Sequence, residues 1–159
     1  MQKEPYAPTL NFIDTLPSTL DTLPDFRARK VIGFVFLWMT YNSEYNLHND
    51  DKAKYDDAKF KNYFLKIGCS YCDTNRTKIY DDLLNTQAGE RRVIKNIYNP
   101  KKDVCVPDSD TAMTCAKVAE AIYTIRCNYL HGDKEMLRDE EQLIVCWAYD
   151  VLRGVVSQP

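Results

Sequence analysis

Residues 110–126, with the sequence DTAMTCAKVAEAIYTIR, carry the longest uninterrupted helical pattern in the chain. Small and apolar side chains recur at intervals of three and four positions, which places them on one face of an α-helix. Arg126 lies four residues after Ile122 and seven after Ala119, so it continues this apolar face. A buried guanidinium needs an acidic partner, an anionic ligand or a water-filled cleft. The segment therefore predicts a core helix with a chemically unusual end.

Similar patterns elsewhere predict further helices. Trp38, Asn42 and Tyr45 are spaced to share one face of the first long helix, and Gly68 is expected to end the second. No internal repeat and no strand-like alternation of any length is present. The sequence therefore predicts an all-α fold, an up-and-down helical bundle. The predicted helices cover residues 26–47, 58–67, 77–84, 90–98, 110–131 and 139–155.

The start of the chain has a different composition. Four of the seven prolines fall within residues 1–25, interspersed with leucines. This spacing predicts an irregular N-terminal arm that packs across the domain or across a partner subunit, followed by a helical domain over residues 26–159.

Length and charge restrict the class of protein. The chain has 159 residues, 45% of them hydrophobic and 28% charged, which is typical of one globular domain. Its net charge of −2 provides no overall attraction to nucleic acid or to an anionic membrane, so a polyanion would need a local basic patch. Residues 31–39, the longest apolar run, are too few to span a bilayer. With no export signal at the start, a cytoplasmic protein with reduced cysteines is expected.

The end of the central helix contains the candidate catalytic residues. Arg126, Asn128 and His131 precede Gly132, and a glycine at this position is typical of a helix C-terminus. His131 is therefore expected where the helix ends, from where its ring can reach the same cleft as Arg126. The chain has only two histidines, and His48, in a polar loop, has no evident partner.

The segment from Tyr123 to Lys134 resembles the Arg-x4-6-His motif of the HEPN family of small helical domains. Residues 36–45, which include Trp38, Asn42 and Tyr45, are similar to the first-helix pattern of some HEPN-like bacterial proteins. The resemblance implies a HEPN-like bundle, a homodimer with two motifs facing one cleft, and a toxin or defence setting with an antitoxin or regulatory partner. In one subgroup of HEPN toxins, a partner enzyme modifies a tyrosine that lies two residues after the histidine. In this chain that position is Asp133, so control by this modification is not expected.

The function that this resemblance implies is metal-independent cleavage of RNA, without a cofactor. His131 would act as general acid or base, Arg126 would bind the phosphate, and Asn128 would orient the phosphate or the imidazole. Two alternatives remain: a non-catalytic module that binds a nucleotide or a protein through the same cleft, and a structural helical protein with a chance motif.

Two further groups of residues are candidates for supporting roles. Asn42, with Trp38 and Tyr45, is expected near the motif, either bonded to it or tying two helices together. A basic patch is the candidate RNA-binding surface, and a solvated charged face is the alternative. Its members are Arg91, Arg92, Lys95, Lys101 and Lys102, with Tyr98 among them.

The cysteines form no strong metal-binding pattern. Cys69 and Cys72 make a single Cys-x2-Cys pair with no second pair at zinc-ribbon spacing. Buried or half-buried thiols are expected, and no metal site.

Overall fold

The computed structural model describes residues 4–16, 27–49, 52–130 and 139–158. Seven α-helices contain most of these residues, so the all-α prediction is confirmed. Two short strands, β1 (Val93–Ile94) and β2 (Val104–Cys105), pair in antiparallel register, with Val93 opposite Cys105. The helices are α1 (Ala7–Thr15), α2 (Arg27–Leu47), α3 (Asp56–Thr74), α4 (Arg76–Leu84), α5 (Gln87–Glu90), α6 (Cys115–Leu130) and α7 (Asp139–Val156), with short 3-10 helices η1 (Pro100–Lys102) and η2 (Asp110–Ala112).

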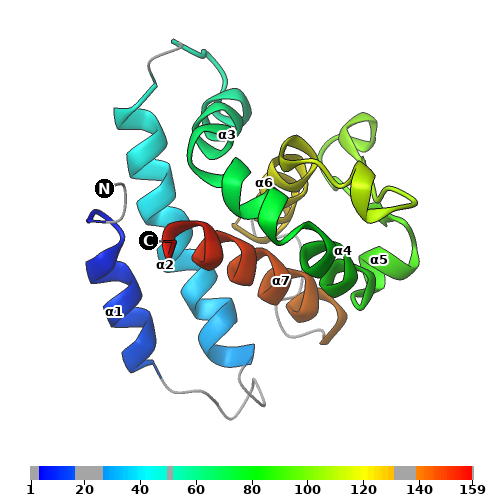
Figure 1. The fold of residues 1–159 in the computed structure, drawn as a ribbon, viewed down its shortest axis with the longest axis horizontal. Helices are drawn as coiled ribbons and strands as arrows, with labels where there is room; N and C mark the ends of the chain where they lie inside the picture. Colours follow the sequence, from blue (N-terminus) through cyan, green and yellow to red (C-terminus); the bar gives the residue numbers. More distant parts are fainter. Residues whose placement is uncertain (1–3, 17–26, 50–51, 131–138, 159) are drawn as a thin grey trace.

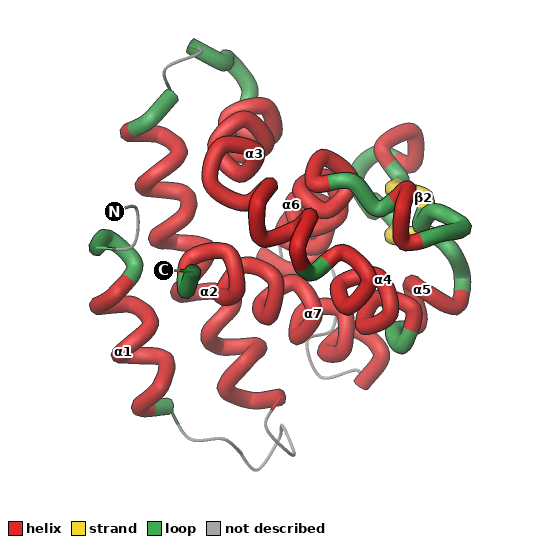
Figure 2. The backbone as a smooth tube through the Cα atoms, viewed as in Figure 1, coloured by secondary structure: helices red, strands yellow, loops and turns green. Residues whose placement is uncertain are grey.

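Two helix pairs make up the centre of the bundle. α2 packs against α7, and α3 packs against α6. α1 lies beside α2 at one end of the molecule, whereas α4 and α5 lie at the other end (Figure 1). The two strands lie on this second side, next to α6 (Figure 2). The helical bundle therefore carries one small non-helical projection.

The core is rich in aromatic side chains. The Trp38 ring lies 4.7 Å from the Phe60 ring and 6.2 Å from the Tyr45 ring, measured between centroids. At the other end of the bundle, Trp147 Nε1 donates to the Ile79 carbonyl oxygen at 2.9 Å and ties α7 to α4. Buried aromatic pairs contribute both apolar area and preferred ring geometry. The largest fully buried rings are those of Trp38, Tyr6, Tyr41, Tyr45, Phe34, Phe60 and Phe64.

The predicted helices around residues 26–47, 77–84 and 139–155 are confirmed as α2, α4 and α7. The central helix begins later than predicted, at Cys115, because Asp110–Ala112 forms a 3-10 turn instead. Ala119, Ile122 and Ile125 are buried, as the pattern indicates.

The N-terminal arm is not irregular throughout, and this part of the prediction is wrong. Residues Ala7–Thr15 form α1, with Pro8 in the first turn, where a missing N–H costs no hydrogen bond. Ile13 is fully buried, and the Tyr6 hydroxyl lies 3.1 Å from that of Tyr63. The segment packs on the bundle through these two side chains.

The helix predicted at residues 90–98 is absent, and β1 occupies this position. Arg92 has a φ of 56°, a left-handed conformation that ends α5 and turns the chain. The Val106 N–H donates to the Arg92 carbonyl at 3.0 Å, and the Asp103 carboxylate accepts the Asn96 N–H at 2.7 Å. These hydrogen bonds join residues 14 and 7 positions apart, so the helical spacing of three and four does not register them.

Two glycines mark close helix contacts. Gly68 does not end α3, as predicted, but lies inside it, where an added Cβ would be 3.3 Å from the Val155 side chain. On α7, a Cβ at Gly154 would lie 2.1 Å from the Tyr71 hydroxyl oxygen, a distance that requires the Tyr71 ring to move. Packing between α3 and α7 therefore outweighs the low helix propensity of both positions.

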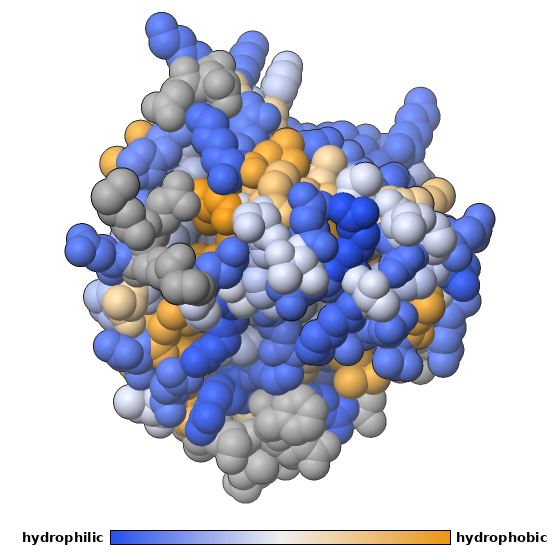
Figure 3. Space-filling view, viewed as in Figure 1, coloured by the Kyte–Doolittle hydropathy of each residue, from blue (hydrophilic) through white to orange (hydrophobic). Residues whose placement is uncertain are grey.

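The surface seen in Figure 3 is mainly hydrophilic, with hydrophobic residues in separate small areas. Across the described part of the chain, no helix has both the length and the apolar character needed to cross a bilayer.

Candidate functional site

Arg126 lies on α6 against the aromatic core. Its guanidinium carbon is 5.3 Å from the centre of the Trp38 ring and 5.6 Å from that of the Tyr123 ring. Its side chain is 18% exposed. Cations at such distances from ring faces are attracted by the ring quadrupole, more so when partly desolvated. The two rings therefore hold the planar guanidinium in a defined position.

Asp56, in the first turn of α3, connects the elements around Arg126. Its Oδ1 accepts from the Tyr45 hydroxyl at 2.8 Å, and its Oδ2 accepts from the Tyr123 hydroxyl at 2.9 Å. Arg126 Nη2 is 4.0 Å from Oδ2. One carboxylate thus links α2, α3 and α6 and provides the acidic partner that a part-buried arginine requires.

The two tyrosines act as hydrogen-bond donors in this cluster. Burial, followed by the hydrogen bond to Asp56, raises the pKa of both Tyr45 and Tyr123 above the usual value for a phenol. Both hydroxyls therefore stay protonated at neutral pH and can donate to the two carboxylate oxygens of Asp56.

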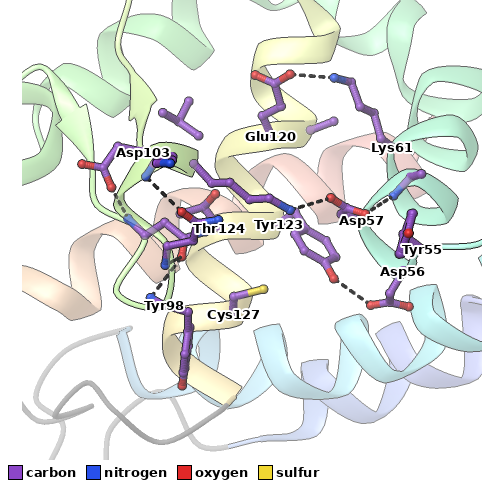
Figure 4. A pocket seen from close by; sticks show the side chains of 17 residues that line it. Tyr55, Asp56, Asp57, Lys61, Tyr98, Asp103, Glu120, Tyr123, Thr124 and Cys127 are labelled. Carbon is purple, nitrogen blue, oxygen red and sulfur yellow. Dashed lines mark hydrogen bonds and ion pairs between the residues drawn. The ribbon is translucent and has the colours of Figure 1, made fainter.

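A cavity of about 820 Å³ lies beside this cluster, between the start of α3, the loop that joins β1 to β2, and α6. Asp56 and Tyr123 belong to both the cluster and the cavity wall, and Cys127 lines the cavity next to Arg126 in the sequence. Figure 4 shows the Tyr123 side chain reaching from α6 to Asp56, with Tyr98 on the opposite side of the cavity. The arginine cluster therefore borders this cavity.

The structure brings the predicted supporting residues together with Arg126. Trp38 contacts the guanidinium directly, and Tyr45 reaches it through Asp56. The side-chain oxygen of Asn42 lies within hydrogen-bonding distance of the Tyr45 hydroxyl. The two segments that carry the family resemblance therefore meet through Trp38 and Arg126, whereas the position of Asn42 near the motif stays a prediction.

Asn128 is directed elsewhere. Its Nδ2 donates to the Lys95 carbonyl at 2.7 Å, and its Oδ1 accepts from the Ile97 N–H at 3.2 Å. Both ends of the buried amide thus fix the chain that follows β1 to α6. The role of Asn128 in orienting a phosphate stays a prediction, and the hydrogen bonds add a structural role that the sequence did not indicate.

The basic patch divides into two parts. Tyr98, Lys101 and Lys102 lie at the cavity. Arg91, Arg92 and Lys95 do not line this cavity. Arg91 and Lys95 line a separate cavity of about 50 Å³, and Arg92 donates to the Tyr80 hydroxyl at 2.9 Å. The helix predicted at residues 90–98 would have placed Arg91 and Lys95 on one face, and this is wrong because the segment is not helical.

His131 lies outside the described residues, so its distance from Arg126 stays a prediction. Asp56 is the site residue that sequence reasoning missed. It stands in a charge-dense stretch, directly before Asp57, and nothing in the sequence separates the two carboxylates. The only available signal is its position in the first turn of a helix. An acidic residue is favoured there in any helix, because it interacts with the positive end of the helix dipole.

All six cysteines are free thiols. Burial, together with the neighbouring Cys115 thiol, raises the pKa of Cys69 to about 12, so this group is a protonated thiol at neutral pH. In the described part of the chain, no cluster of histidine, cysteine, aspartate or glutamate has the arrangement needed to hold a metal ion.

No family model, curated protein or solved structure matches the chain. The likeness to HEPN domains therefore depends on the sequence of residues 36–45 and 123–134 alone.

Replacement of Asp56 by alanine is expected to lower the free energy of unfolding by about 1–3 kcal/mol, because two part-buried tyrosine hydroxyls and Arg126 lose their acceptor. The matched control is Asp57→Ala, which removes an exposed ion pair with Lys102 and is expected to cost about 0–1 kcal/mol. Urea unfolding followed by tryptophan fluorescence measures both. Equal losses for the two variants would contradict the assigned role of Asp56.

Proposed function

We propose that the protein is a metal-independent endoribonuclease of HEPN type, in which Arg126 binds the scissile phosphate and His131 transfers protons. The observation that carries this proposal is the position of Arg126. Its guanidinium is stacked on Trp38 and Tyr123 at the border of a large cavity, five residues before the histidine in sequence. An oriented, permanently charged fork of donors suits the charge that develops on phosphoryl oxygens.

In the proposed reaction, the 2′-oxygen of RNA attacks the adjacent phosphorus in line. His131 as general base removes the 2′-proton, or as general acid protonates the leaving 5′-oxygen. The P–O5′ bond breaks, which leaves a 2′,3′-cyclic phosphate on one fragment and a 5′-hydroxyl on the other. The nucleophile belongs to the substrate, so the protein supplies only proton transfer and charge stabilisation.

The same resemblance supports further proposals about the setting. A homodimer would place two copies of Arg126 and His131 on one cleft. A toxin or defence role, an antitoxin or regulatory protein as partner, and a cytoplasmic location belong to this proposal.

A non-catalytic module that binds nucleotides or proteins is the second candidate, and the contacts of Asn128 favour it. This amide bonds the chain after β1 at both ends instead of facing Arg126. In that case the same cavity would hold a ligand without cutting it.

Incubation of labelled RNA with the purified protein in excess EDTA tests the proposal. We expect cleavage into fragments with 2′,3′-cyclic phosphate ends, and we expect His131→Ala to be about 100-fold slower or more, the usual contribution of a general acid or base. His48→Ala is the matched control, because it removes the only other histidine, which is exposed and lies 3.5 Å from Glu44. Uncut RNA, together with saturable nucleotide binding, would instead support the module.

A further inference from the structure

Three tyrosines face the cavity beside Arg126. Tyr98, on the loop between β1 and β2, is 51% exposed, and Tyr55, before α3, is 67% exposed. Tyr123, from α6, lies between them (Figure 4). Exposed aromatic rings at the wall of a cavity are platforms for planar groups, and stacking on a nucleobase is tolerant of base identity.

Thr124 provides a polar group on the same cavity wall. The residue is only 4% exposed, it lines the cavity, and none of the hydrogen bonds found among the described residues involves its hydroxyl. A hydroxyl at a cavity wall can donate one hydrogen bond and accept others from a bound group or from water. Thr124 can therefore bond to the polar edge of a bound group.

The charges of the cavity argue against a phosphate inside it. Lys61 is paired with Glu120 at 2.6 Å, and Lys102 is paired with Asp57 at 3.2 Å. Lys101 forms no ion pair with any residue in the described ranges. The cavity thus offers one uncommitted lysine for a phosphate and a largely neutralised interior. The lining carboxylates are those of Asp56, Asp57, Asp103 and Glu120, against the ammonium groups of Lys61, Lys101 and Lys102.

We infer that the cavity binds an unpaired nucleobase of single-stranded RNA. Tyr98 stacks on the base, the Thr124 hydroxyl bonds to its edge, and Lys101 contacts the adjoining phosphate. This inference rests on the proposed RNA chemistry and specifies its substrate as single-stranded, since a base stacked in the cavity cannot remain paired. Because Asp56 and Tyr123 join the cavity to Arg126, the neighbouring phosphate is brought to the arginine.

Binding of a fluorescent 2′-O-methyl RNA single strand, measured by anisotropy, tests the inference. The methylated 2′-oxygen cannot attack the phosphorus, so binding is observed without cleavage. We expect Tyr98→Ala to weaken binding by about tenfold or more, within the range for loss of one stacked base. Thr124→Val, which replaces the hydroxyl with a methyl group of similar size, is expected to weaken binding by about fivefold, as loss of one hydrogen bond predicts. The duplex of the same sequence is expected to bind at least about tenfold more weakly.

Lys78→Ala is the control, because Lys78 is an exposed lysine on α4 that pairs with Asp82. We expect it to bind the strand as the unchanged protein does. Wild-type affinity of both Tyr98→Ala and Thr124→Val, equal binding of the duplex, or no binding of either form would overturn the inference. Cleavage of ordinary RNA that is indifferent to Tyr98 and Thr124 would leave the proposed nuclease standing and the base site refuted. Binding of the strand that depends on Tyr98 and Thr124, without cleavage of ordinary RNA in EDTA, would support the base site and refute the proposed nuclease.

Discussion

Replacement of Arg126 by alanine is expected to slow RNA cleavage by about 100-fold or more. The reason is the loss of the guanidinium that would stabilise charge on the phosphoryl oxygens, and removal of one such donor costs about two to three orders of magnitude. Arg126→Lys keeps the charge but loses the planar fork that stacks on Trp38 and Tyr123. We expect it to remain folded and to cleave about tenfold more slowly. Initial rates on a labelled RNA, at protein concentrations corrected for the folded fraction, measure both effects.

Arg153 offers a matched control for the structural part of this change. It also lies over an aromatic ring, 6.0 Å from the centre of Tyr149, and it pairs with Asp14 at 2.8 Å. Arg153→Ala therefore removes the same kind of contacts at a site outside the cavity lining. We expect Arg153→Ala to lower the free energy of unfolding, as Arg126→Ala does, and to leave the rate of RNA cleavage unchanged. A rate for Arg126→Ala equal to that of Arg153→Ala would assign Arg126 a structural role only.

Replacement of Trp38 by alanine is expected to lower the free energy of unfolding by about 3–5 kcal/mol, the usual range for a buried large aromatic. The ring is 2% exposed and packs on Phe60, Tyr45 and Arg126, so its removal opens a cavity at the centre of the bundle. Trp38→Phe should cost much less, because most of the ring contacts remain. Thermal and chemical unfolding, followed by circular dichroism, distinguish the two variants.

The neighbouring Met39 supplies the control for this substitution. It lies on the same helix and is 61% exposed. Met39→Ala is expected to change stability by less than about 0.5 kcal/mol, as is usual for a surface position. A similar effect of both substitutions would show that the aromatic cluster contributes less than its burial indicates.

Helical periodicity predicted the parts of this fold that depend on local pattern. α2, α4, α6 and α7 all carry apolar residues at intervals of three and four, and this spacing is visible in a short window of sequence. The segment from Arg92 to Val106 lacks this property. Its conformation depends on the hydrogen bond between Asn96 and Asp103, 7 residues apart, and on the one between Lys95 and Asn128, 33 residues apart. The spacing of three and four does not encode such partners, so the sequence predicted a helix over residues 90–98.

The candidate site was likewise predictable only in part. Arg126 is a charged residue on an apolar helix face, which marked it as unusual, and Trp38 and Tyr45 belong to the segment that resembles the family; the structure places the three together. Asp56 shows no such contrast with its surroundings, because it stands among other charged residues. The division of the basic patch was equally hidden, since it follows from the turn at Arg92.

The contact between Gly154 and Tyr71 implies a pattern of joint variation in evolution. A side chain at position 154 is compatible with the present helix spacing only if the ring at position 71 is smaller or turned away. Homologues that carry alanine or serine in place of the glycine are therefore expected to have lost the tyrosine as well. Because the two positions lie on α3 and α7, such paired changes would identify distant relatives of this fold even where the Arg126 segment has diverged.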